Sequence, residues 1–152
     1  MNKKVWWKGF FWSINLLFLA ILLGFSGVAS ATTMNAENLD TLAAGETIEG
    51  PGFFAGNVVK VDGNVEGTTF VSGQDVRING NINGDLFVAA QSITINGTVI
   101  GNIYGSGQAL TFDGQSGRDV FFAGLNIAIG QDAPVGTNIF VAGATFLQGG
   151  II

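Results

Sequence analysis

The chain has 152 residues, of which 47% are hydrophobic and 11% charged, and it contains 24 Gly but no Cys and no His. The lack of Cys and His excludes disulfides, Cys-ligated zinc, thiol nucleophiles and any His-dependent catalytic triad. The formal net charge is −5, but three lysines in the first eight residues hide a balance of 3 − 11 = −8 from residue 32 onward. An acidic remainder of this kind lacks the basic patch that nucleic-acid binding requires, so no nucleic-acid partner is expected.

Residues 1–31 have the pattern of a secretory signal. A short basic stretch precedes the apolar run 9–28, and Ala29 and Ala31 then occupy the two small-residue positions of a signal-peptidase cleavage site. The apolar run also reaches the roughly 20 residues that a helix needs to cross a bilayer, so an uncleaved membrane anchor remains the alternative. Both interpretations predict an N-terminal hydrophobic helix. Both also place residues 32–152 outside the cytoplasm, secreted or attached to the outer face of the cytoplasmic membrane.

Residues 32–52 differ in composition from the segments on either side of them. They are small, polar and acidic, and Pro51-Gly52 closes the stretch. This composition predicts a flexible acidic linker or an N-terminal cap, leading into a domain that spans residues 53–152.

An internal repeat runs through that domain. Six blocks begin with an aromatic residue and are spaced by 17, 17, 17, 17 and 19 residues, the fifth block absorbing two extra residues around Asp132-Ala133-Pro134. The third position of each block is Ala or Ser, the seventh is apolar, and an Asp-Gly or Asn-Gly pair follows the ninth position in the first four blocks. The six aromatic residues are Phe53, Phe70, Phe87, Tyr104, Phe121 and Phe140.

The repeat predicts a β-solenoid. Stretches such as Ile93-Thr94-Ile95 are β-branched with a period of two, which is typical of short strands, and the Asn-Gly and Asp-Gly pairs indicate turns with positive φ. Antiparallel hairpins would not bring like residues into register every 17 positions, whereas a solenoid stacks like on like. We therefore expect an all-β, single-stranded parallel β-helix of about six coils. The periodicity leaves its handedness open.

The alternation of side chains places the aromatic column on the outside of the solenoid. The residues on either side of each aromatic position are mostly apolar and are expected to face inward, so the six rings form an exposed stacked ladder. Such a ladder adds contacts between coils, and it also creates an apolar patch that soluble monomers seldom expose. Two interpretations stay open: a purely stabilising ladder, or a lateral contact with another filament, a protein or a bilayer.

The repeat resembles a known family. The segments VRINGNINGDLFVA, ITINGTVIGNIYGSG and GRDVFFAG are similar to the bactofilin-type, polymer-forming cytoskeletal repeat family over about residues 45–152. The resemblance implies a right-handed parallel β-helix that polymerises end to end without nucleotide, with the end coils around 53–69 and 140–152 as contact surfaces. Bactofilins proper are cytoplasmic and have no cleavable signal, so this chain looks more like secreted or membrane-attached relatives, in which transmembrane segments can follow.

The C-terminal coil is expected to be an assembly edge. The sequence stops part way through a coil, which we interpret as a short or truncated member. An uncapped parallel edge is a template for pairing with another chain. The residues predicted to form this edge are Phe146, Leu147, Ile151 and Ile152.

Catalytic chemistry is not expected. Asp62 and Asp113 lie in a turn column with Asn79 and Asn96 between them, and solvated turn residues explain them better than a pair of catalytic acids. No cofactor or metal is predicted. The leading hypothesis is a non-enzymatic scaffold at the cell envelope whose main partner is itself, with membrane or cell-wall components as further partners. The alternative is an extracytoplasmic adhesin or a polysaccharide- or protein-binding solenoid. A degenerate carbohydrate-active enzyme is the third hypothesis.

Overall fold

The computed structural model describes residues 40–131 and 133–149, all within a compact unit that spans Asn35–Ile152. The expected N-terminal hydrophobic helix, the cleavage site at Ala29 and Ala31, and the edge residues Ile151 and Ile152 lie outside this range. In the part of the chain that is described, no helix has the length and apolar character needed to span a bilayer.

The described residues form short and long strands in a repeating order. Their bounds are β1 Thr41–Leu42, β2 Thr47–Glu49, β3 Gly52–Val61, β4 Asn64–Glu66, β5 Thr69–Ile78, β6 Leu86–Ile95, β7 Thr98–Val99, β8 Ile103–Phe112, β9 Gln115–Ser116, β10 Val120–Ile129 and β11 Ile139–Gln148.

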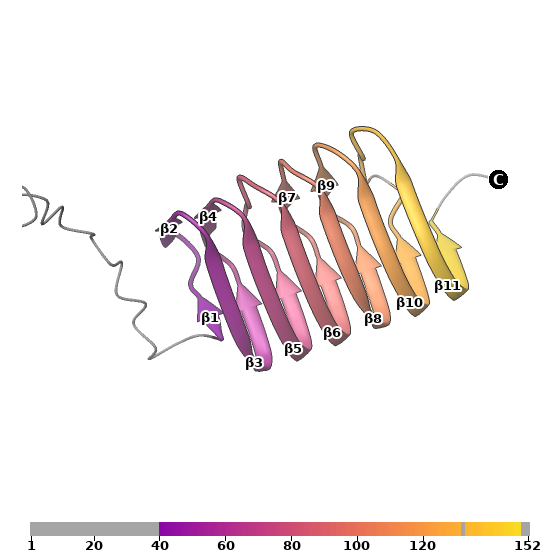
Figure 1. The fold of residues 1–152 in the computed structure, drawn as a ribbon, viewed down its shortest axis with the longest axis horizontal. Helices are drawn as coiled ribbons and strands as arrows, with labels where there is room; N and C mark the ends of the chain where they lie inside the picture. Colours follow the sequence, from indigo (N-terminus) through magenta and orange to yellow (C-terminus); the bar gives the residue numbers. More distant parts are fainter. Residues whose placement is uncertain (1–39, 132, 150–152) are drawn as a thin grey trace, which may run out of the picture. The chain divides into compact units, whose positions relative to one another are not determined.

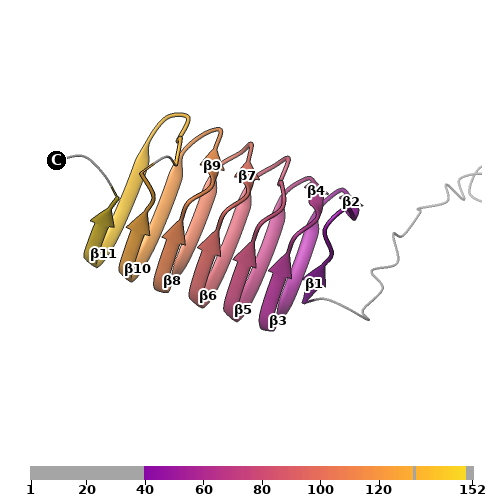
Figure 2. The same cartoon turned by 180° about the vertical axis from the view of Figure 1, so that it is seen from behind.

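The strands wind into a parallel solenoid (Figure 1). The ten-residue strands pair in parallel in the order β3-β5-β6-β8-β10-β11, with β1 against β3, and the short strands form two further parallel pairs, β2-β4 and β7-β9. Seen from behind, the coils again succeed one another from β3 to β11 (Figure 2). The predicted all-β parallel β-solenoid of about six coils is thus confirmed.

The pairing register reproduces the sequence repeat. Phe53 pairs with Phe70 and Phe70 with Phe87, which is a step of 17 residues. The pairing of Phe121 with Phe140 takes a step of 19, so the two extra residues are accommodated between β10 and β11 without shifting the columns. Like residues therefore stack on like residues along the solenoid.

Each long strand turns a corner near its middle. In β5, Val71 and Val76 are both buried although they are five residues apart, an odd spacing that a flat strand cannot give. The pairing register also skips Gln74 between these two positions. The first half of each long strand therefore lies on one face of the solenoid and the second half on another, while the short strands contribute to a third.

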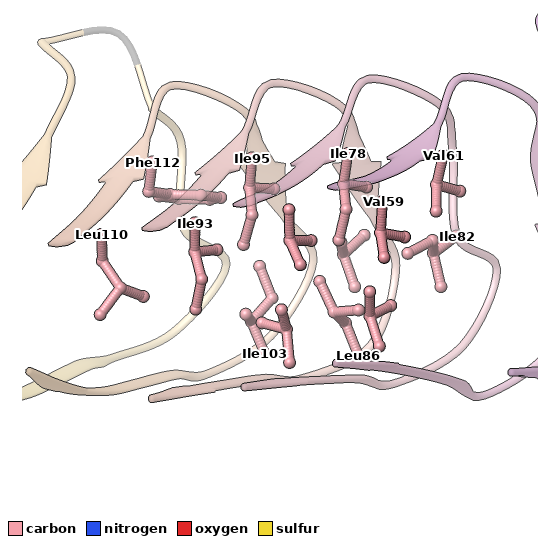
Figure 3. Close-up of a cluster of buried hydrophobic side chains, with 14 of the residues drawn as sticks. Val59, Val61, Ile78, Ile82, Leu86, Ile93, Ile95, Ile103, Leu110 and Phe112 are labelled. Atoms are coloured by element: carbon pink, nitrogen blue, oxygen red, sulfur yellow. The ribbon is translucent and has the colours of Figure 1, made fainter. Parts of the chain in front are cut away.

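Apolar columns fill the interior (Figure 3). Val59, Val76, Ile93, Leu110 and Ile127 stack in one column, and each has 2% or less of its surface exposed. A single coil could not exclude water from such side chains, because each is covered mainly by its counterparts in the neighbouring coils. The core is continuous along the stack for the same reason.

The solenoid begins before the expected boundary at residue 53. Within the segment expected to be a linker or cap, β2 pairs with β4 through Ile48 and Val65, and β1 pairs with the end of β3 through Leu42 and Val61. Leu42 is buried in the core. Residues 41–49 therefore form an incomplete coil, because their few apolar residues align with the interior columns.

The turn glycines differ from the expectation of positive φ. The described glycines with positive φ are Gly45 and Gly50, at 87° and 98°, and neither belongs to an Asn-Gly or Asp-Gly pair. At Gly80, Gly97 and Gly114 an added Cβ would instead collide with the carbonyl oxygen of the glycine one coil earlier. Close approach of successive coils, and not backbone conformation, thus requires glycine in this column.

Candidate functional site

The six aromatic residues form one continuous stack along the outside of the solenoid. Neighbouring rings have centroids 4.7–5.2 Å apart and planes within 5–10° of parallel. The register of the long strands brings each ring onto the next, since every ring occupies the second residue of its strand. Stacking of this kind contributes about 0.5–1.5 kcal/mol per pair beyond the area it buries.

The stack hides the faces of the rings and exposes their edges. Tyr104 and Phe87, inside the stack, have 36% and 37% of their surface exposed, whereas Phe53 and Phe140 at its ends reach 45% and 51%. The inner rings are covered on both faces by their neighbours. The surface presented to solvent is therefore a ridge of aromatic edges, and among the described residues only the two end rings have a face that no neighbouring ring covers.

A column of small residues runs beside this ridge. Two residues after each ring, on the same outward side of the strand, the side chain is Ala or Ser. The members of this small-residue column are Ala55, Ser72, Ala89, Ser106, Ala123 and Ala142. We call the ridge and this column together the aromatic face; it belongs to the first halves of β3, β5, β6, β8, β10 and β11 and contains no charged residue.

Polar side chains at the corners form ladders between coils. Asn79 Nδ2 donates to Asp62 Oδ1 at 2.6 Å, and Asn96 Nδ2 donates to Asn79 Oδ1 at 2.8 Å. A second ladder precedes the aromatic ridge, where Asn102 Nδ2 donates to Asp85 Oδ1 at 3.2 Å. In both ladders the amide donates toward the preceding coil, so an Asp carboxylate, which can only accept, is paired with an Asn one coil later.

The second corner ladder alternates Asp and Asn. Asp85, Asn102, Asp119 and Asn138 follow one another, and Asn138 donates to Asp119 Oδ1 through both its backbone N, at 3.0 Å, and its Nδ2, at 3.1 Å. The alternation keeps the carboxylates two coils apart, which limits their mutual repulsion. The Asp85 and Asp119 carboxylates thus accept hydrogen bonds that link neighbouring coils.

The predicted C-terminal edge is exposed where the same columns elsewhere are buried. Phe146 continues the column of Ile127 but has 46% of its surface exposed against 1% for Ile127. Ile139 has 37% exposed against 0% for Val120, the residue that it pairs with in β10. Leu147 lies on the outward side and is 65% exposed. Within the described residues β11 has β10 as its one neighbour, so the interior columns open to solvent there.

The other end of the solenoid is partly covered. β1 pairs with Lys60 and Val61 only, and β2 covers β4. On the side of β3 away from β5, no described strand pairs with its first half, Gly52–Gly56. The two ends are therefore unlike: among the described residues, the C-terminal end leaves the whole outer edge of β11 unpaired, and the N-terminal end leaves only the first half of β3 unpaired.

The carboxylates do not gather into a cation site in the described part of the chain, where no group of three or more Asp and Glu side chains is placed to bind a metal. The one ion pair seen among these residues joins Arg77 Nη2 to Asp75 Oδ2 at 3.6 Å, and it is solvent-exposed, so it contributes little. Comparison of the chain with family models, with curated proteins and with solved structures found no match.

Proposed function

We propose that this chain is a non-enzymatic structural protein whose solenoid associates end to end with further copies of itself. The proposal extends the resemblance to the bactofilin-type repeat family, which also implies right-handed winding. The observation that carries it is the open edge of β11, where Ile139 and Phe146 leave core columns exposed. A strand of another copy placed on this edge would bury both side chains and satisfy the outer backbone groups of β11.

The gain from covering the edge is substantial. Complete burial of a Phe or Ile side chain contributes about 1.5–3 kcal/mol. Phe146 and Ile139 each retain over a third of their surface, so they supply only part of that amount, and the backbone hydrogen bonds of a ten-residue strand add to it. The edge is therefore an effective contact for a strand that matches its columns.

The non-enzymatic part of the proposal is supported by the positions of the carboxylates. Asp62, Asp85 and Asp119 each accept a hydrogen bond from an Asn in the following coil. Acids used in this way stabilise the stack, and they lie in different coils or on different corners. A general acid and base would need to converge on one substrate position.

We place the scaffold outside the cytoplasm, at the outer face of the cytoplasmic membrane, with membrane or cell-wall components as further partners. This part of the proposal rests on residues 1–31 and their cleavage site at Ala29 and Ala31. Determining the N-terminal residue of the protein purified from its host tests it. A chain that begins at Thr32 supports cleavage, whereas an intact N-terminus supports an anchor.

The alternative of a polysaccharide-binding module was suggested by the exposed aromatic column. Sugars stack on the faces of aromatic rings, and here the inner rings cover one another at 4.7–5.2 Å. The geometry therefore favours the structural proposal. Retention of a glycan by the wild-type chain, lost on Phe87→Ala, would instead support the binding module.

Electron microscopy of the purified full chain tests the end contact. We expect filaments for the wild type and shorter or no filaments for Phe146→Glu, because a carboxylate placed in a core column cannot be covered by a second copy. Ile100→Glu is the matched control, since Ile100 is 55% exposed but lies mid-stack on the short-strand side. Equal filament lengths for both variants, or strictly single particles of the wild type at high concentration, would count against the proposal.

A further inference from the structure

The aromatic face has a ridge and a groove side by side. The aromatic residue and the small residue of each coil are two positions apart, so the two columns run parallel at about 7 Å from one another. The ridge consists of ring edges and the groove of Ala and Ser side chains, over six successive strands. No charged side chain of the face opposes burial of this surface.

We propose that the occupant of this face is the aromatic face of a second copy of the chain, with the two solenoids side by side and their axes parallel. This inference rests on the proposed end-to-end assembly, to which it adds a lateral contact. A two-fold axis parallel to the solenoid axis reverses the strand direction between copies. The ridge of each copy then lies over the groove of the other.

The other face-to-face arrangement fails on shape. A two-fold axis along the strand direction would place the two solenoids antiparallel and would leave the strand direction unchanged. The ridge would then meet the ridge, and the groove would meet the groove, which separates the sheets and leaves a void. Close packing at interfaces matches that of protein interiors, so the parallel arrangement is selected.

The two borders of the aromatic face carry different side chains. Asp85 lies two residues before the ridge position of its strand, and Gln91 lies two residues after the groove position. The parallel two-fold brings each border column opposite the other one, so in the coil of β6 the Asp85 carboxylate of one copy faces the Gln91 amide of its partner, whereas in the coil of β10 Asp119 faces Leu125.

The area of the face decides when the pairing is stable. Five residues of about 3.3 Å each and six strands at about 4.8 Å give roughly 475 Å² per copy, or about 950 Å² for the pair. A stable specific interface needs more than roughly 1,000 Å² in total. Two single solenoids therefore pair weakly, but every copy added end to end lengthens the face. Lateral pairing thus belongs to filaments of two or more copies.

The test introduces two charges into the groove. Ser106→Glu with Ala123→Glu places carboxylates in the small-residue column of β8 and β10, where both side chains are exposed. The matched control is Ala109→Glu with Asn126→Glu, on the same two strands, three residues further on and beyond the corner, where both side chains are again exposed. By electron microscopy of the full chain we expect paired filaments for the wild type and the control, and single filaments of unchanged length for the groove variant.

The outcomes separate this inference from the end contact. Wild-type filaments that are always single, or pairs that persist in the groove variant, overturn lateral pairing. Sedimentation velocity of the Phe146→Glu chain tests whether copies that do not assemble end to end still pair laterally. A weak, concentration-dependent dimer that the groove substitutions abolish supports pairing even if no filament forms, whereas a chain that stays monomeric at millimolar concentration overturns it. Binding to phosphatidylcholine vesicles that the groove variant loses, without any dimer, would assign the face to a bilayer and also overturn pairing.

Discussion

Gly97 occupies a position where successive coils come closest. An added Cβ there would collide with the carbonyl oxygen of Gly80, and the same holds at Gly114 against Gly97. The Asn-Gly pattern predicted a turn with positive φ here, whereas the structure has the end of a strand followed by a bend. Local turn preferences report backbone conformation, whereas the constraint at this column comes from a residue 17 positions away, which a local pattern cannot reveal.

Gly97→Ala is expected to destabilise the solenoid by about 1–3 kcal/mol, because the backbone of two coils must separate to admit the methyl group. Urea unfolding of the full chain measures this change. Gly149→Ala is the control, since its nearest neighbours would lie 3.3–3.4 Å from the new Cβ and the first of them is the flexible side chain of Gln131. Equal effects at the two sites would contradict the close approach.

Gly105 has a different reason to be glycine. It faces the interior in the column of Val88 and Phe122, and an added Cβ would lie 2.8 Å from Phe122 Cδ1 and 2.9 Å from Leu110 Cδ2. The Phe122 ring takes the volume that a side chain at residue 105 would fill, and it packs edge-on against Phe112 at 5.8 Å. A large residue in one coil is thus compensated by the absence of a side chain in the coil before it.

This compensation predicts strong coupling between two substitutions. Gly105→Val alone is expected to cost about 1–3 kcal/mol through overpacking, and Phe122→Val alone about 2 kcal/mol through the cavity it leaves. The double variant should recover most of the loss, because it recreates the valine column seen at Val71 and Val88. A double-mutant cycle based on urea unfolding measures this coupling. If the losses in the free energy of unfolding of the two single variants simply add in the double variant, the two sites are independent.

At the scale of the elements, the long strands could be predicted well from the sequence, but the short strands β1 and β2 could not. Aromatic, small and apolar positions recur in the long strands β3, β5, β6, β8, β10 and β11, so their columns are visible in the sequence. β1 and β2 lack the leading aromatic residue, and β1 pairs with β3 at a step of 19 instead of 17. Their membership in the solenoid depends on Leu42 and Ile48 meeting columns that only the folded coil defines.

The corner ladders give a prediction at this scale. Asn79→Asp would remove the 2.6 Å hydrogen bond to Asp62 and place two carboxylates in neighbouring coils. We expect a loss of up to about 1 kcal/mol, because like charges directly opposite one another repel. Asn57→Asp, at an exposed corner position, is the control for added charge. If raising the salt concentration fails to reduce the difference in thermal unfolding temperature, charge repulsion is not its source.

At the scale of the aromatic face, the sequence predicted that the rings lie outside and stack, but not what they present to a partner. The aromatic column was visible from the repeat, and so was the Ala or Ser two positions later. The orientation of the rings, with planes within 10° of parallel, depends on the inter-strand spacing and side-chain rotamers. That orientation turns a set of aromatic side chains into a ridge of edges beside a groove.

At the scale of the whole molecule, the stack formed by residues 40–131 and 133–149 has two unlike ends and an aromatic face without charged residues. Stability of a solenoid comes from nearest-neighbour contacts between coils, so the outermost coil is the least stabilised. In the described residues that coil is β11, whose Phe146 and Ile139 lie in core columns yet remain exposed. The proposed pairing with a further copy would complete the contacts that every inner coil already has.

Amide hydrogen exchange of β11 tests this central claim most directly. A parallel strand with neighbours on both sides has its amides bonded on both, whereas β11 pairs with β10 alone among the described residues. In the assembled full chain we predict that amides of residues 139–148 exchange more slowly than in the unassembled Phe146→Glu chain, while those of β6, already bonded on both sides, are unchanged. Equally fast exchange of β11 in assembled and unassembled chains would contradict strand pairing between copies.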